Sequence, residues 1–117
     1  MEIQRKPFEA TVRVLPGTAV IDLHGEIDGF ADAALTVAYD EAERQQPASI
    51  LLNFGDVSYI NSTGIALIVG LLARARKDQR RLLTCCLSDH YQEIFQITRL
   101  SDFMSIYPDE ASALLGD

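Results

Sequence analysis

Hydrophobic and polar residues follow two different periods along this chain. Apolar residues alternate with polar ones over residues 8–15, which predicts a strand with one solvent-exposed face. A turn over 16–18 and a second strand over 19–25 complete an antiparallel hairpin. Residues 49–54 form a short, almost continuously apolar run, which is typical of a buried strand.

Longer segments with helical spacing separate the strands. Residues 31–46 predict a helix that ends before Pro47, and residues 62–77 predict a more apolar helix. This second helix contains Gly70, whose small size we expect to permit close packing against a strand. The remaining predicted elements are a strand over 81–87, a helix over 90–98 capped by Ser88 or Asp89, a strand over 103–107, and a helix that opens at Pro108 and ends near 115.

Strands that alternate with helices indicate βαβ crossovers and a largely parallel sheet. We therefore expect one α/β domain over residues 1–117, a length typical of a single domain. Its mixed, mostly parallel five-stranded sheet carries the N-terminal antiparallel hairpin at one edge, and about four helices flank it.

Charge and composition narrow the possible functions. The net charge of −7 argues against nucleic-acid binding, because the phosphate backbone would be repelled. The one basic cluster lies at the end of the second helix, and we expect it to complement the dipole of that helix. Its members are Arg74, Arg76, Lys77, Arg80 and Arg81.

No apolar run approaches the roughly 18–20 residues of a membrane span, so direct membrane insertion is not expected. Residues 1–6 precede no long apolar segment, so we expect no signal peptide. The adjacent Cys85 and Cys86 are expected to point to opposite faces of a strand as reduced thiols, which fits a cytoplasmic protein. With no second Cys or His pair at ligand spacing, neither a metal nor a cofactor is expected.

A polar segment, Asn61-Ser62-Thr63-Gly64, lies directly before the most apolar helix. Capping alone explains it, because Asn, Ser and Thr accept hydrogen bonds from the free amides at a helix start. A hydroxyl there also suits phosphorylation, since the helix dipole and the amides stabilise the added negative charge. The residues by themselves leave both roles open, and they do not separate Ser62 from Thr63.

Two motifs together resemble the signature of the STAS domain, the domain of bacterial anti-anti-sigma factors. Residues 56–64 read D-V-S-Y-I-N-S-T-G before an apolar helix, where the family pattern is an Asp, a few mostly apolar residues and then Asp-Ser-Ser/Thr-Gly. Residues 23–28 read L-H-G-E-I-D and resemble the family's Leu-x-Gly-x-Leu/Ile-Asp. The spacing and the element order also agree, so the resemblance covers about residues 12–114.

The resemblance implies a STAS-type fold and a binding protein without catalysis of its own. It implies that Ser62, rather than Thr63, is phosphorylated by an anti-sigma factor that has a histidine-kinase-like ATPase domain. The unphosphorylated protein then binds this partner and frees a sigma factor, and a PPM-type phosphatase removes the phosphate. The residues we assign to the partner-binding surface are Glu26, Asp28, Tyr59, Asn61, Ser62, Thr63 and Gly64.

Three of these assignments have structural alternatives. Glu26 and Asp28 suit turn and capping chemistry as well as partner binding. Tyr59 is either an interface aromatic or a core ring with its hydroxyl at the surface. Because the carboxyl ends of parallel strands share one edge of a sheet, we expect Asp28 and Ser62 to lie close together.

Asn61 departs from the family pattern, which usually has Asp at this position. This departure motivates an alternative function: a constitutive, unphosphorylated STAS module that is a subunit of a signalling scaffold or of a lipid-transport complex. A small enzyme is a third class, but no nucleophile–base pair, metal set or phosphate-binding glycine loop is evident. We expect His24 and His90 to be structural or surface residues.

Overall fold

The computed structural model of the protein describes residues 7–116, so the expectation drawn from residues 1–6 lies outside the described residues. Its strands are β1 (Glu9–Leu15), β2 (Thr18–Ile27), β3 (Ser49–Ile60), β4 (Arg81–Cys85) and β5 (Ser105–Tyr107). Its helices are α1 (Asp32–Arg44), α2 (Ser62–Lys77), α3 (Asp89–Ile97) and α4 (Glu110–Gly116), with short 3-10 turns η1 (Gly29–Ala31) and η2 (Leu100–Asp102).

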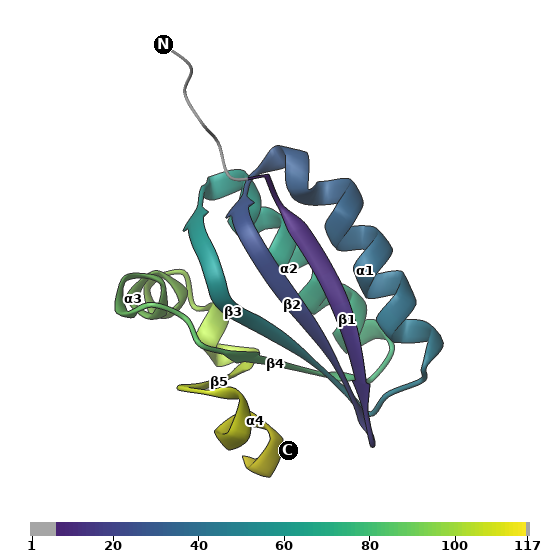
Figure 1. The fold of residues 1–117 in the computed structure, drawn as a ribbon. Helices are drawn as coiled ribbons and strands as arrows, with labels where there is room; N and C mark the ends of the chain where they lie inside the picture. Colours follow the sequence, from purple (N-terminus) through teal and green to yellow (C-terminus); the bar gives the residue numbers. More distant parts are fainter. Residues whose placement is uncertain (1–6, 117) are drawn as a thin grey trace.

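The strands form one sheet in the order β1-β2-β3-β4-β5. The β1–β2 pair is antiparallel, and the other three pairs are parallel. This confirms the predicted mixed sheet with an N-terminal edge hairpin. Figure 1 shows that β2 and β3 end at the same end of the sheet, next to the beginning of α2.

The sheet buries apolar residues on both faces. The larger cluster joins strand residues such as Leu52 and Phe54 to Tyr39 of α1, Ile68 of α2 and Phe95 of α3. The rings of Phe54 and Phe95 meet edge to face, with their centroids 5.9 Å apart. The smaller cluster lies on the opposite face, where α4 covers β4 and β5. Three helices therefore pack on one face of the sheet and the short C-terminal helix packs on the other.

The central strand β3 is longer than its apolar pattern predicted. The sequence predicted an end at Phe54, whereas the strand continues to Ile60. Its pairing with β4 stops at Asn53, but its pairing with β2 continues through two register shifts. Gly55 and Asp56 are poor strand formers, so the partner strand overrides local preference here. The predicted loop is consequently a strand that leads directly to Asn61.

The prediction for Gly70 is wrong. A Cβ atom built at this exposed glycine meets nothing within 4 Å, so its small size serves no close contact. The glycine that allows α2 to pack closely against a strand is instead Gly64, which lies against Ile27 of β2.

The prediction that the two cysteines point to opposite faces is also wrong. Strand β4 ends at Cys85, and Cys86 adopts a left-handed conformation with φ +67°. The two sulfur atoms consequently lie 3.3 Å apart. Both residues are free thiols, as predicted.

Three members of the basic cluster, Arg74, Arg76 and Lys77, lie in the last turn of α2 at the negative end of the helix dipole, as predicted. Arg80 follows the helix, and Arg81 begins β4. Arg74 also joins α2 to α1, because its Nη2 lies 2.9 Å from Asp40 Oδ1 and its guanidinium stacks 4.4 Å from the centroid of the Tyr39 ring. No helix within residues 7–116 is long and apolar enough to cross a bilayer.

Candidate functional site

The end of β2 and the beginning of α2 are in direct contact. The Asn61 N–H donates to the Ile27 carbonyl oxygen over 3.2 Å. A Cβ atom built at Gly64 would lie 2.1 Å from the same oxygen and 3.0 Å from Ile60 Cγ2. Only a glycine lets the helix approach the strand this closely, because a side chain would collide with the backbone.

Asn61 is the N-cap of α2. Its backbone is extended, and its Oδ1 accepts the Gly64 N–H over 2.8 Å. The first two helical residues, Ser62 and Thr63, are exposed, and neither side chain takes part in this cap. The capping role predicted for this segment thus belongs to Asn61, and the two hydroxyls are left at the surface of the first turn.

The loop after β2 lies against this first turn. A Cβ atom at Gly29 would be 3.6 Å from Thr63 Cγ2, which agrees with the expected proximity of Asp28 and Ser62. The Asp28 side chain caps η1 by accepting the Phe30 N–H over 2.9 Å, so its predicted capping role is confirmed. The Phe30 ring, two residues further along, is 85% exposed.

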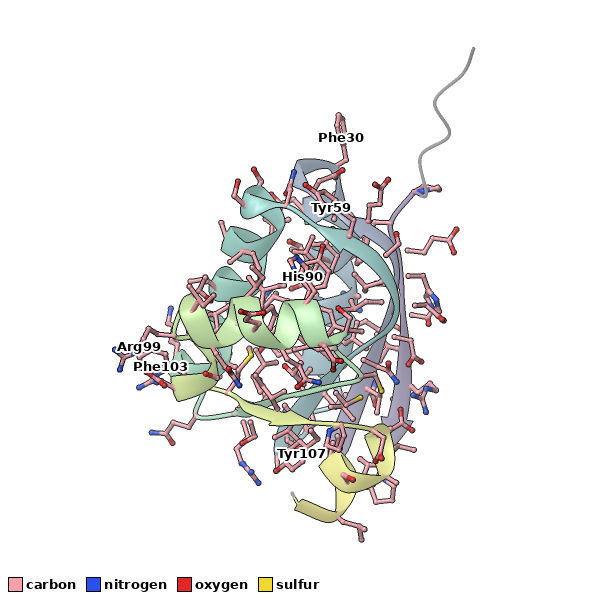
Figure 2. All side chains as sticks on the ribbon, turned by 90° about the vertical axis from the view of Figure 1, so that its left-hand side faces the viewer. Phe30, Tyr59, His90, Arg99, Phe103 and Tyr107 are labelled. Atoms are coloured by element: carbon pink, nitrogen blue, oxygen red, sulfur yellow. The ribbon has the colours of Figure 1, made fainter. Side chains whose placement is uncertain are left out.

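Glu26 of β2 and Tyr59 of β3 are paired in the register of these two parallel strands. Glu26 is half-buried, whereas the Tyr59 side chain is 49% exposed. The alternative of a core ring for Tyr59 is therefore wrong. Figure 2 shows Phe30 and Tyr59 toward one end of the molecule, with His90 of α3 close by.

A cavity of about 420 Å³, which we call the Ser62 groove, opens between the end of β3, the start of α2 and helix α3. The Tyr91 hydroxyl joins two of these elements by accepting the Ile60 N–H over 2.8 Å. The groove is mostly apolar, and none of its side chains is acidic. Its lining residues are Tyr59, Ile60, Asn61, Ser62, Ile65, His90, Tyr91, Ile94 and Thr98.

Sequence reasoning missed the contribution of α3 to this groove. The sequence indicates an apolar side of this helix with Ile94, Phe95 and Ile97, and a surface or structural role for His90, but it does not indicate a groove. Phe95 is indeed buried, but Ile94, one residue earlier, lines the groove with His90 and Tyr91. The Tyr91–Ile60 hydrogen bond spans 31 residues in sequence, and no local signal predicts it.

The second histidine lies in a different setting. His24 Nδ1 is 3.0 Å from Asp56 Oδ2, and the His24 side chain is 40% exposed, as expected for a surface residue. Within residues 7–116, no three His, Cys, Asp or Glu side chains come together as a metal site. The chemistry that this end of the molecule offers is an exposed hydroxyl at a helix start beside a mostly apolar groove.

Comparison with known proteins places the chain in a family. The family model of the STAS domain matches residues 9–113. The chain belongs to the STAS domain family. This STAS protein is 32% identical over 82 residues to the anti-sigma-B factor antagonist of Listeria monocytogenes, a match that covers 70% of this chain and 72% of that protein.

Solved structures confirm the predicted STAS-type fold. An anti-sigma factor antagonist from Mycobacterium paratuberculosis superposes on this STAS protein with a TM-score of 0.81 at 19% identity, over 94% of this chain and 93% of that chain. The phosphorylated form of the Bacillus cell fate determinant SpoIIAA superposes with a TM-score of 0.67 at 25% identity, over 91% of this chain and 96% of that chain.

Proposed function

We propose that this STAS protein is an anti-sigma factor antagonist and acts in the cytoplasm as a binding protein without catalysis of its own. The observation that carries the proposal is the exposed Ser62 hydroxyl at the start of α2, next to the Ser62 groove. The similarity to the Listeria protein, itself an anti-sigma-B factor antagonist, supports the class of function.

The partner-binding surface in this proposal is the end of the molecule around Ser62. It combines the Ser62 groove with Glu26 near the end of β2 and Asp28 directly after that strand, and the exposed Phe30 ring adds to it. Exposed aromatic rings beside an apolar groove match the composition of interface cores. The partner is an anti-sigma factor with a histidine-kinase-like ATPase domain, which inserts apolar side chains into the groove.

Phosphorylation of Ser62 by this partner is the proposed switch, and Thr63 is the second candidate. Because Asn61 alone caps α2 with its side chain, Ser62 accepts a phosphate without loss of the cap. A phosphate adds about −1.5 to −2 charges, which an apolar partner surface does not solvate. SpoIIAA has been solved in unphosphorylated and phosphorylated forms, which supports a switch of this kind. A PPM-type phosphatase resets the protein.

Asn61 keeps open a second function, a constitutive STAS module in a signalling scaffold or a lipid-transport complex. Its Oδ1 supplies the helix cap, so the fold does not need the family's usual carboxylate at this position. Such a module would bind its partner permanently and carry no phosphate.

Phosphate mapping separates the two functions. The protein is incubated with native cell extract and ATP, and its intact mass and phosphopeptides are then measured beside a known STAS phosphoprotein as positive control. We expect one phosphate on Ser62, its loss in Ser62→Ala and its retention in Thr63→Ala. An unmodified protein beside a labelled control would favour the constitutive module, and Asn61→Asp is then the first variant to test for labelling.

A further inference from the structure

The Ser62 groove contains one residue that can carry a positive charge. Among its nine lining residues, His90 is the only potential cation, and there is no Lys, Arg, Asp or Glu. The charge of the groove therefore depends on His90 and on whatever is attached to Ser62. No other side chain that lines the groove carries a charge.

A hydroxyl donor lies beside His90. The Tyr91 hydroxyl oxygen accepts the Ile60 N–H, which leaves its own hydrogen as a donor. The rings of His90 and Tyr91 pack edge to face, with their centroids 4.8 Å apart. Both side chains come from the first turn of α3 and line the cavity that Ser62 lines from the start of α2. Figure 2 shows His90 between α3 and Tyr59.

We propose that His90 and Tyr91 bind the phosphate of phosphorylated Ser62, so that modification fills the Ser62 groove from within the protein. An imidazolium and a phenol both donate hydrogen bonds, and a phosphate offers three acceptor oxygens. The proposal rests on Ser62 as the modified residue in the proposed function. It adds a mechanism for the switch: the phosphate bridges α2 to α3 and occupies the space that a partner side chain would take.

The interaction is expected to change with pH, because the charge of a phosphate and the charge of an imidazole both depend on pH. The phosphate loses its second proton at about pH 6, and an ordinary histidine is half protonated near pH 6.5. The other groove-lining side chains that can titrate are Tyr59, on β3, and Tyr91, the neighbour of His90 on α3. Asp89 and Glu93 are acidic neighbours on α3, and both are exposed. A nearby cation favours the dianion, so His90 is expected to lower the titration midpoint of the phosphate.

The test is a ³¹P NMR titration of the full chain with phosphoserine incorporated at position 62 during translation, which requires no kinase. Three proteins are compared: the parent sequence, His90→Gln and the matched control His24→Gln, which removes the histidine beside Asp56. We expect the midpoint of the parent and of the His24→Gln variant to lie on the order of 0.5 pH unit below that of His90→Gln. Equal midpoints in all three proteins, or equal rises in both variants, would overturn the proposal.

Tyr91→Phe provides a second measurement at the same site. It retains the ring and removes the hydroxyl, both as a donor to the phosphate and as the acceptor of the Ile60 N–H. It is expected to shift the ³¹P resonance of the dianion while the far-UV circular dichroism stays the same. An unchanged resonance in a folded variant shows that Tyr91 does not bind the phosphate. Neither experiment uses the partner, so a negative result here leaves the proposed function standing. Conversely, a phosphoprotein that binds its partner normally would refute the proposed function whatever the midpoints are.

Discussion

Gly64→Ala is the substitution that most directly probes how the site is built. The alanine Cβ would lie 2.1 Å from the Ile27 carbonyl oxygen and 2.8 Å from the Ile27 carbonyl carbon. Both are backbone atoms, so no rotamer change relieves the contact. The same oxygen accepts the Asn61 N–H, and a shift of the helix would therefore also disturb the link between β2 and α2.

Overpacking of this kind typically costs about 1–3 kcal/mol. Alanine is favoured over glycine within a helix by about 1 kcal/mol, which offsets part of the cost. A contact with the backbone belongs at the upper end of the range, so we expect Gly64→Ala to lower the free energy of unfolding by a net amount of about 2 kcal/mol. For a domain of this size, about 1 kcal/mol corresponds to a change of several degrees in Tm.

Gly70→Ala is the matched control, since it is the same substitution in the same helix at a position where a Cβ meets nothing within 4 Å. It is expected to raise the free energy of unfolding by about 0.5–1 kcal/mol. Urea unfolding measures both variants, and equal slopes identify the change in midpoint as a change in stability. If the two variants agree to within about 0.5 kcal/mol, the close approach of α2 to β2 is refuted.

Three further predictions follow from the side chains around the sheet. Asn61→Ala is expected to lower the free energy of unfolding by about 1 kcal/mol, whereas Asn61→Asp keeps an acceptor for the Gly64 N–H and loses less; urea unfolding compares the two. Cys86 is expected to react with iodoacetamide in the folded protein and Cys85 only on unfolding, because burial shields the Cys85 thiol and raises its pKa. Peptide mapping after timed alkylation measures the order of reaction, and faster labelling of Cys85 would contradict the prediction. The hydrogen bond from Arg13 lowers the pKa of Glu110 in the folded protein. This ion pair therefore stabilises the fold fully above the ordinary glutamate pKa of about 4.3, and the stabilisation is lost as the pH falls through the lower pKa of the folded state. Glu110→Gln should therefore flatten the acid limb of the stability curve, and an unchanged limb would contradict the role of this pair.

The sequence pattern predicted those helices and strands whose apolar spacing matches the face that they bury in the folded protein. Helix α2 begins and ends as its apolar spacing and its capping segment indicated, and the β1–β2 hairpin followed from alternation and a turn. The second half of β3 could not be predicted in this way. It begins with Gly55 and Asp56, which have weak strand preference, and it is held by pairing with β2, a strand distant in sequence.

In the candidate site, too, the local motifs could be predicted from the sequence, whereas the features that depend on tertiary packing could not. The Asn61–Gly64 segment and the carboxylates near the end of β2 are readable as motifs, because their spacing is local. The groove, by contrast, forms only because α3 packs beside β3 and α2. The hydrogen bond between Tyr91 and Ile60 connects α3 to β3. The approach of the two cysteine sulfurs depends on a single positive φ at Cys86, and non-glycine residues adopt this conformation too rarely for a sequence pattern to indicate it.

The measurement that tests the central claim most directly is the affinity of an anti-sigma factor, encoded in the same genome, for three forms of this protein. These are the unmodified chain, the chain with phosphoserine at 62 and the chain with phosphothreonine at 63. The account predicts tight binding by the unmodified chain and a loss of at least tenfold, about 1.4 kcal/mol, on phosphorylation of Ser62, with a smaller loss at Thr63. Equal affinity of the unmodified and Ser62-phosphorylated chains would contradict it.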